Sequence, residues 1–232
     1  MIGKTVAKRP QFDLDVTNDS DRSFNAYSIT VNGATKTTNE FGQSNKAYSF
    51  DGVNDYIVIG NATTYDTFID LLNAGGVSLF MIINNDKGVS QNDIIFSALA
   101  NPVDFTKGCQ ISESSGSYMY IGSGSTMDSV YTTTSEILTT WKSKNFQSEY
   151  ATTKYNGAIY ENGSAMSLTK SDTNQLASKS VDTDRALWFG WRQNTPANRS
   201  FKGKLGTLRI YNENLTAGQN KIINNEKGRI TV

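Results

Sequence analysis

The sequence predicts an all-β fold, an antiparallel β-sandwich that ends in one short helix. Short runs of β-branched and aromatic residues recur between Gly, Asn and Asp residues, a pattern typical of many strands joined by turns. Within several runs apolar and polar residues alternate, as they do in half-buried strands of sheets packed face to face. The length of 232 residues suits one such domain with a full core.

The strands follow one another along most of the chain, and alternation assigns their faces. Ile57 and Ile59 share one face, whereas Tyr56 and Val58 share the other. The segments that carry the strand pattern are, in chain order, Ala26–Val31, Lys46–Phe50, Tyr56–Ile59, Val77–Asn84, Asp93–Ala98, Gln110–Ser112, Tyr118–Gly122, Phe146–Tyr155, Ala158–Glu161, Leu187–Arg192 and Leu205–Tyr211.

Asn-Gly pairs mark the tightest turns between these strands. A type I′ hairpin turn needs positive φ at both central residues, which Asn and Gly tolerate. The sequence therefore predicts hairpins at Asn32-Gly33, Asn156-Gly157 and Asn162-Gly163.

The stretch "AYSFDGVNDYIVIG" places Asp51, Asn54 and Asp55 at a sharp bend between two predicted strands. The first interpretation is a hairpin turn, because Asp-Gly and Asn supply turn geometry. Calcium is the rival, since it takes oxygen ligands from closely spaced carboxylates and loop carbonyls. Two Asp and one Asn supply too few ligands alone, so a calcium site would need other loops. No other cofactor is expected.

The two ends of the chain differ from its centre. Leu215–Gly228 predicts the C-terminal helix, with Thr216 as N-cap, Ile222 and Ile223 on the apolar side, and Gly228 as the stop. Residues 1–25 predict an extended N-terminal arm with a polar loop, and residues 26–232 predict the sandwich domain.

Charge and composition exclude several functional classes. Lys plus Arg and Asp plus Glu both number 22, so the chain lacks the cationic surplus that grips nucleic acid. Histidine is absent, which removes the usual general base near neutral pH and the Ser-His-Asp triad. Cys109 is the single cysteine, so we expect no intrachain disulfide and no Cys-rich zinc site. We expect Cys109 to be a small buried apolar residue.

No segment predicts insertion into a membrane. The longest apolar run, Val77–Ile83, is far too short to span a bilayer. The N-terminal stretch "MIGKTVAKRPQFDLD" is basic but lacks the apolar core of an export signal. From these features we expect a chain that carries no recognisable export signal.

The carboxylates do not form a hydrolase pattern. Glycoside hydrolysis needs two carboxylates that flank the bond, and glucanases of related sandwich fold place them as Glu-x-Asp-x-Glu on one strand. No such triplet occurs: Asp13 and Asp15 have the strand spacing but no following Glu, and Glu149 stands alone. We expect no enzymatic activity.

Aromatic residues beside polar ones favour ligand binding instead. Sugar recognition needs aromatic faces together with Asn, Asp or Arg, and such residues gather in "YMYIG" and "LWFGWRQNTPANRS". The alternation places Trp188 on the face opposite Phe189, so one tryptophan can face solvent while Phe189 joins the core. The alternative is that both tryptophans fill the sandwich or its rim. The candidate ligand-binding residues are Trp188, Trp191, Arg192, Asn194 and Asn198.

The order of these motifs resembles a known family. "TVNGATKTTNEFGQSNKAYSFDGVNDYIVI", "VSLFMIIN", Trp141 followed by "YENG", and "LWFGWRQ" followed by "RSFKGKLGTLRIYNENLTAGQNKII" occur in the order found in laminin-G-like, concanavalin-A-like jelly-roll domains. The likeness covers residues 26–228. The chain departs from the family at "QFDLDV" and at "WKSKNF", which lacks the usual histidine.

The resemblance implies a module that binds rather than catalyses. Family members bind carbohydrates, glycoproteins or other surface partners, and occur in secreted enzymes and in fibres and surface proteins of bacteriophages. It therefore implies a phage virion surface protein: a head fibre, a decoration protein or a tail-associated adhesin. Its partners would be virion subunits docked through the N-terminal arm, a cell-surface glycan, or further copies of the chain. The alternative is an extracellular carbohydrate-binding domain of a secreted bacterial glycan-degrading enzyme.

Overall fold

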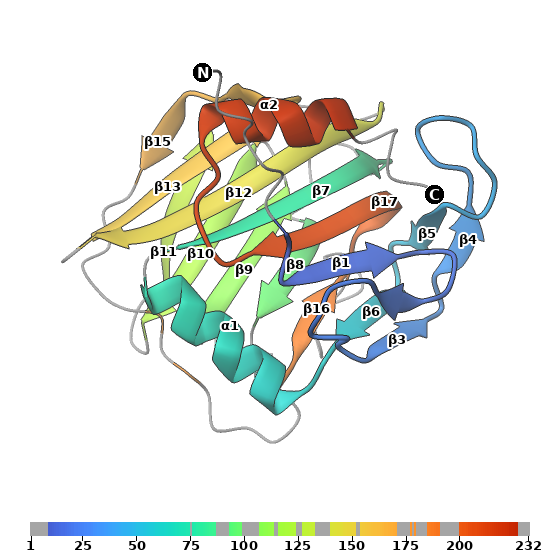
Figure 1. Ribbon diagram of the computed structural model, residues 1–232, viewed down its shortest axis with the longest axis horizontal. Coiled ribbons are helices and arrows are strands. Elements are labelled where there is room, and N and C mark those ends of the chain that lie inside the picture. Colours follow the sequence, from blue (N-terminus) through green and yellow to red (C-terminus); the bar gives the residue numbers. More distant parts are fainter. Residues whose placement is uncertain are drawn as a thin grey trace, which may run out of the picture.

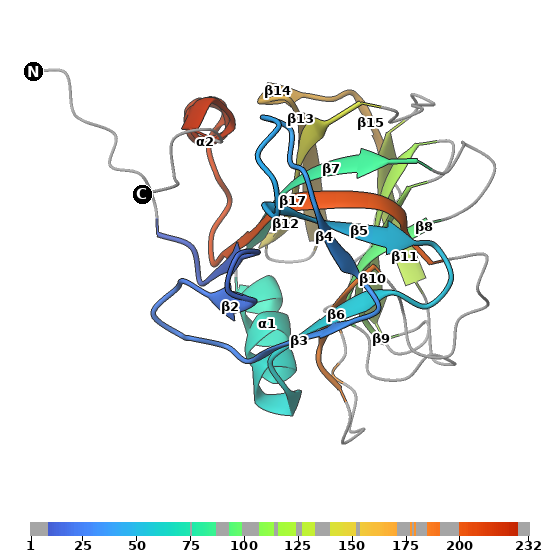
Figure 2. The same cartoon turned by 90° about the vertical axis from the view of Figure 1, so that its right-hand side faces the viewer.

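The protein is built as two stacked antiparallel sheets with two helices, as the computed structural model shows (Figures 1 and 2). This confirms the predicted all-β sandwich with a short C-terminal helix. The structure describes residues 9–74, 76–86, 93–98, 107–113, 116–123, 127–132, 140–151, 154–170, 177, 179, 185–190 and 200–226. None of its helices over these ranges has the length and apolar character needed to cross a membrane.

The first sheet has nine strands in the described part of the chain. Its main path runs β14-β13-β12-β7-β17-β1-β2, and β5 pairs with both β17 and β4. The strands are β1 (Phe12–Asp15), β2 (Ser20–Asp21), β4 (Thr35–Thr37), β5 (Ala47–Asp51), β7 (Val77–Asn85), β12 (Lys142–Ala151), β13 (Lys154–Glu161), β14 (Ser164–Ala165) and β17 (Lys202–Tyr211).

The second sheet has eight strands over the same ranges, in the order β15-β11-β10-β9-β8-β16-β6-β3. The strands are β3 (Ile29–Asn32), β6 (Tyr56–Ile59), β8 (Asp93–Ala98), β9 (Lys107–Glu113), β10 (Ser117–Ser123), β11 (Met127–Thr132), β15 (Leu168–Lys170) and β16 (Leu187–Phe189).

Alternate residues of the two sheets face each other and form the core. Phe50 of the nine-stranded sheet meets Phe189 of the eight-stranded sheet with ring centroids 5.3 Å apart, and Phe201 packs 5.5 and 5.6 Å from these two rings. Tilted and edge-on pairs of this kind add to the stabilisation from burial. Cys109 is also fully buried in this core, as the sequence predicts.

Helix α1 (Ala62–Ala74) is an element that the sequence analysis missed. Asn61 caps it, because its Oδ1 accepts hydrogen bonds from the backbone N–H groups of Thr63 and Thr64 at 3.0 and 3.3 Å. The helix packs against β12 and β8, one strand from each sheet, and therefore closes a side of the sandwich. Its buried apolar residues have helical spacing: Tyr65, Phe68, Ile69 and Leu72.

Helix α2 (Ala217–Glu226) is the predicted C-terminal helix. Thr216 Oγ1 accepts from the Gln219 N–H at 3.3 Å, while Gln219 Oε1 accepts from the Thr216 N–H at 2.7 Å, which is a capping box. The helix lies on the outer side of the nine-stranded sheet (Figure 2). Ile223 is buried there with Phe80 and Ile82 of β7, so both faces of this strand are covered. The predicted stop at Gly228 lies outside the described residues.

Two predicted hairpins are instead crossings between the sheets. The Asp51–Asp55 bend joins β5 of the nine-stranded sheet to β6 of the eight-stranded sheet, and Asn32-Gly33 joins β3 to β4 in the opposite direction. Because β3 pairs with β6 and β4 with β5, the two crossings lie side by side. The hairpin interpretation was therefore wrong at both places.

The other two Asn-Gly pairs differ from each other. Asn162-Gly163 is the predicted hairpin between β13 and β14, with φ values of 48° and 78°. Asn156-Gly157 instead lies inside β13, paired with β12, and forms no turn. Extended pairing with a neighbouring strand overrides the local turn preference at this second pair.

The predicted N-terminal arm contains a core strand. β1 pairs with β17, and Phe12, Leu14 and Val16 are buried in the main core. The carboxylate of Asp13 receives the Nε–H of Arg209 on β17 at 3.1 Å. Residues 12–16 are thus part of the sandwich, in contrast to the expectation of an extended arm over residues 1–25.

Candidate ligand-binding face

The outer face of the eight-stranded sheet carries a row of side chains that runs across the strands. Strand register aligns Trp188 of β16 with Ser97 of β8, Ser97 with Gln110 of β9, and Gln110 with Tyr120 of β10. Val58 of β6 continues the row beyond Trp188. Paired residues project to the same side of a sheet, so these residues form one continuous strip. We call the strip from Trp188 to Tyr120 the aromatic row.

One end of the aromatic row is a pair of rings. Leu187 and Phe189 are buried in the core, so Trp188 between them projects outward and is partly exposed. Its ring lies 5.3 Å from that of Tyr56 on β6, and the Asn32 side-chain amide donates to the Tyr56 hydroxyl at 3.1 Å. The prediction that Trp188 takes the face opposite Phe189 is confirmed.

The other end is a second pair of rings. Tyr118 and Tyr120 lie two residues apart on β10, so both project outward while Met119 between them is buried. Their rings are parallel within 7° and 5.8 Å apart. Because β10 and β16 are separated by β9 and β8, the two aromatic ends stand about 14 Å apart, three strand spacings. A short oligosaccharide can bridge such a span.

The centre of the aromatic row is polar and closely packed. Gln110 is 7% exposed and Ser97 is fully buried. Among the described residues, the Ser97 hydroxyl has no hydrogen-bond partner. A buried hydroxyl without a partner costs about 1–3 kcal/mol. Because both polar side chains are covered, the contact surface of the aromatic row lies at its two aromatic ends.

The structure describes only part of the other predicted site residues. Trp191, Arg192, Asn194 and Asn198 lie outside the described residues. Asp51 is exposed at the crossing, where its Oδ1 accepts from the N–H groups of Val53 and Asn54 at 2.7 and 3.4 Å. No group of three metal-binding side chains occurs within the described ranges.

Asp55 has a structural role in the same crossing. Its Oδ2 accepts from the Asp51 N–H at 2.8 Å, and a Cβ at Gly33 would approach its Oδ1 to 2.0 Å. Gly33 therefore allows the two crossings to pack closely. Burial raises the pKa of the Asp55 carboxyl, an effect that the Asp51 N–H opposes and the Asp51 charge reinforces.

A buried ionic cluster at one margin of the core was not predicted. Lys144 is fully buried on β12, with its Nζ 2.7 Å from Glu161 Oε2 and 3.6 Å from Glu113 Oε1. Ser117 Oγ donates to Glu113 at 2.6 Å and accepts from Lys144 at 2.9 Å. Lys142 Nζ lies 2.7 Å from Glu161 Oε1, so two lysines balance the two carboxylates. The cluster therefore holds the two sheets together rather than lining an open cleft.

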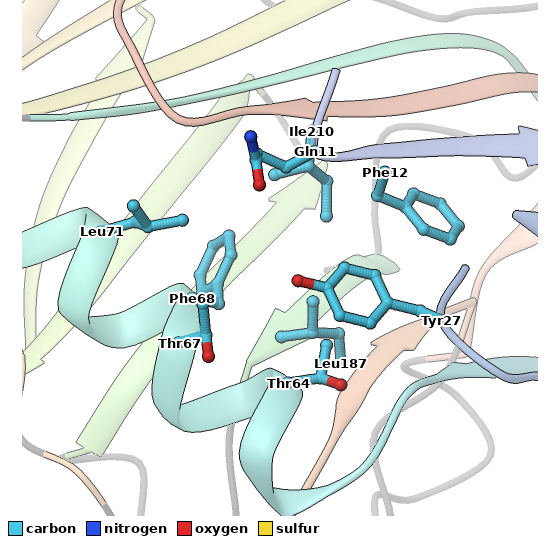
Figure 3. A pocket seen from close by; sticks show the side chains of 9 residues that line it. All are labelled: Gln11, Phe12, Tyr27, Thr64, Thr67, Phe68, Leu71, Leu187 and Ile210. Carbon is cyan, nitrogen blue, oxygen red and sulfur yellow. The ribbon is translucent and has the colours of Figure 1, made fainter. Parts of the chain in front are cut away.

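A small cavity separates α1 from β1 (Figure 3). Its volume of about 20 Å³ holds about one water molecule, so it offers no room for a ligand. The residues around it are mostly apolar: Gln11, Phe12, Tyr27, Thr64, Thr67, Phe68, Leu71, Leu187 and Ile210.

The chain matches no protein-family model and no curated protein. It resembles solved structures of botulinum neurotoxin binding domains. These include type C, whose cell entry depends on two ganglioside molecules (TM-score 0.68, 11% identity, 94% of this chain and 51% of that chain). They also include the type G receptor-binding domain (TM-score 0.65, 13% identity, 94% of this chain and 51% of that chain). A third is the DC binding domain in complex with rat synaptotagmin II (TM-score 0.66, 12% identity, 95% of this chain and 52% of that chain).

At these identities the likeness shows the fold alone. The chain spans about half the length of each of these structures. What this chain shares with these domains is therefore a β-sandwich fold, and fold alone does not fix a ligand.

Proposed function

We propose that this chain is a non-enzymatic recognition module that binds a glycan along the aromatic row. The observation that carries the proposal is the register that aligns Trp188, Ser97, Gln110 and Tyr120 in one strip. The two partly exposed aromatic ends can stack on the apolar faces of sugar rings, while the buried polar centre holds the strands between them. The fold's occurrence in domains whose names state ganglioside and receptor binding supports the same function.

The absence of catalytic machinery in the sequence supports a binding role. The chain has no histidine, and the carboxylates of buried Glu113 and partly buried Glu161 lie beside the ammonium group of Lys144. A general acid or base must reach the proton that it transfers. The described carboxylates of this cluster face the core and not a substrate.

We further propose that the module belongs to the surface of a phage virion, as a head fibre, a decoration protein or a tail-associated adhesin. The resemblance to laminin-G-like, concanavalin-A-like jelly-roll domains supports this setting, because that family includes phage fibres and surface proteins. Docking onto a virion subunit would use the residues before β1, since Phe12 and Leu14 are already buried in this chain's own core.

An extracellular carbohydrate-binding domain of a bacterial glycan-degrading enzyme is the second candidate. The observation in its favour is that the similar sandwiches are parts of chains about twice as long. Mass spectrometry of purified virions separates the two settings. The chain in intact particles supports the virion role, whereas a chain fused to a catalytic domain in culture supernatant supports the second.

A glycan array followed by titration calorimetry tests the binding function. We expect Trp188→Ala and Tyr120→Ala to weaken the best array ligand by about thirtyfold each, the cost of about 2 kcal/mol typical of a central aromatic contact. Phe41→Ala is the matched control, because Phe41 is 48% exposed on the β4–β5 loop, outside the row. Unchanged affinity in both row variants would exclude the aromatic row as the binding site.

A further inference from the structure

A second site lies on the N-terminal part of the sandwich, around β1 and β2. A surface pocket of about 240 Å³ is lined there by Arg9, Pro10, Asp13, Arg22, Ser23 and Phe24. Pockets for drug-sized ligands hold about 300–1,000 Å³, so this one has room for a single ring-sized group. It is separate from the aromatic row, whose residues belong to the other sheet.

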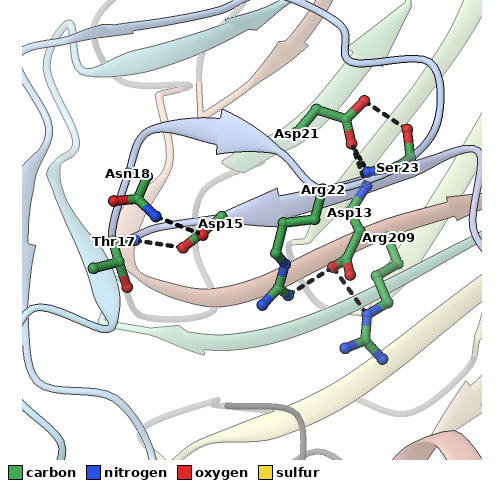
Figure 4. Close-up of polar contacts among 8 residues, drawn as sticks. All are labelled: Asp13, Asp15, Thr17, Asn18, Asp21, Arg22, Ser23 and Arg209. Atoms are coloured by element: carbon green, nitrogen blue, oxygen red, sulfur yellow. Dashed lines mark hydrogen bonds and ion pairs between the residues drawn. The ribbon is translucent and has the colours of Figure 1, made fainter. Parts of the chain in front are cut away.

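The charge of this pocket is positive. Asp13 is its one carboxylate, and a single oxygen of Asp13 receives both Arg22 Nη2 at 3.0 Å and Arg209 Nε at 3.1 Å (Figure 4). Arg209 is buried and suffices to balance the charge of Asp13. Among the lining residues, Arg9 and Arg22 supply two positive charges against one carboxylate, and both side chains reach solvent.

The carboxylate of Asp21 lies near the pocket but does not line it, and its oxygens already accept four hydrogen bonds. It accepts from the N–H and hydroxyl of Ser23 at 2.8 and 2.7 Å, and from the backbone N–H groups of Asp13 and Tyr27 at 2.9 and 3.0 Å. These bonds fix the loop that carries Arg22 and Phe24. The pocket is therefore held in shape before any ligand arrives.

Phe24 adds an apolar face beside the two guanidinium groups. Its side chain is 85% exposed, the largest exposure among the large apolar residues that the structure describes. The guanidinium of Arg9 lies over the ring at 5.1 Å from its centroid. An arginine stacked on an aromatic ring keeps its planar fork of donors available for a carboxylate.

We infer that this pocket binds a single carboxylate-bearing sugar unit, such as a uronic acid residue of an acidic glycan. The carboxylate pairs with Arg9 and Arg22, whose forks match its geometry. The apolar face of the sugar ring rests on Phe24. One sugar ring fits the volume of the pocket, its carboxylate fits the two arginines, and its apolar face fits the exposed ring of Phe24.

Titration of the full chain with methyl β-glucuronide, followed by NMR and calorimetry, tests the inference. Binding is expected to exceed that of methyl β-glucoside by at least about tenfold, because charge-assisted hydrogen bonds are lost with the neutral sugar. Arg9→Gln, Arg22→Gln and Phe24→Ser should each weaken the glucuronide by about tenfold. Unchanged thermal unfolding midpoints would show that these variants are folded.

Matched controls lie elsewhere on the surface. Lys221→Gln removes the same charge from α2, and Phe41→Ser removes another exposed aromatic, so neither should change glucuronide binding. Trp188→Ala should leave it unchanged too, which separates this site from the proposed glycan row. Equal binding of glucoside and glucuronide, or full affinity in Arg9→Gln, would overturn the inference. Inorganic sulfate that binds as tightly as the glucuronide would overturn the sugar assignment.

Discussion

Replacement of Lys144 by methionine should be among the most damaging changes to stability in this chain. The Lys144 side chain is fully buried, and its ammonium group lies 2.7 Å from Glu161 and 3.6 Å from Glu113, which is 3% exposed. Methionine fills a similar volume but removes the ammonium group beside Glu113. Removal of one partner from a buried pair costs about 3–5 kcal/mol. For a domain of this size that lowers the unfolding midpoint by about 6–20 °C.

A neighbour on the same strand provides the control. Lys142 Nζ also lies 2.7 Å from Glu161, but its side chain is 20% exposed and Glu161 is 14% exposed. Because water can screen the pair, Lys142→Met should cost about 1 kcal/mol or less. The comparison holds the residue type, the strand and the contact with Glu161 constant, and it changes the burial of the lysine and its contact with Glu113.

The assay is chemical denaturation of each variant, with free energies of unfolding compared at one pH. The double variant Lys144→Met, Glu113→Gln removes the uncompensated carboxylate and should recover at least half of the loss, since contacting residues couple by about 0.5–3 kcal/mol. Equal losses for Lys144→Met and Lys142→Met, or no recovery in the double variant, would refute the assignment of this cluster as a buried ionic tie between the sheets.

Of three further predictions, the first two concern buried ionisable groups and the third concerns calcium. Burial raises the pKa of the Cys109 thiol to about 12, so a disulfide reagent at pH 8 should label the chain only after unfolding; labelling of the native protein would show that the site opens. Burial raises the Asp55 pKa in the folded state, so the wild type loses stability relative to Asp55→Asn as pH rises from 4 to 7; a difference that does not vary with pH would contradict this. Millimolar calcium should leave the unfolding midpoint unchanged, because the Asp51 and Asp55 carboxylates already accept backbone N–H groups; a rise of several degrees would restore the calcium site.

Local pattern was sufficient for several strands and for α2, but not for β1, β11 or the division of the predicted strand Phe146–Tyr155 between β12 and β13. Tyr56–Ile59 and Asp93–Ala98 have the bounds that the sequence predicts, because apolar residues and turn residues delimit them sharply. The capping box at Thr216 and Gln219 likewise depends on residues close in sequence. Helix α1 was missed because its Thr and Asp residues favour turns, although the spacing of Phe68, Ile69 and Leu72 carries the helical signal.

The remaining features depend on contacts that are distant in sequence. Asp-Gly and Asn-Gly specify backbone dihedrals, but they do not determine whether the next strand returns to the same sheet or crosses to the other. The alignment of Tyr120 with Trp188 results from the pairing of four strands, which no local pattern encodes. The sequence analysis found both aromatic clusters but could not place them on one face.

Fluorine NMR of the protein labelled with 5-fluorotryptophan tests the central claim most directly. Trp188 lies on the outer face of the eight-stranded sheet, whereas Trp141 packs against Phe80, Ile82 and Tyr211 on the outer side of the nine-stranded sheet. A saturating glycan identified on the array should shift the resonance that disappears in Trp188→Phe and leave that of Trp141 in place. A shift of the Trp141 resonance alone, with Trp188 unmoved at saturation, would contradict recognition along the aromatic row.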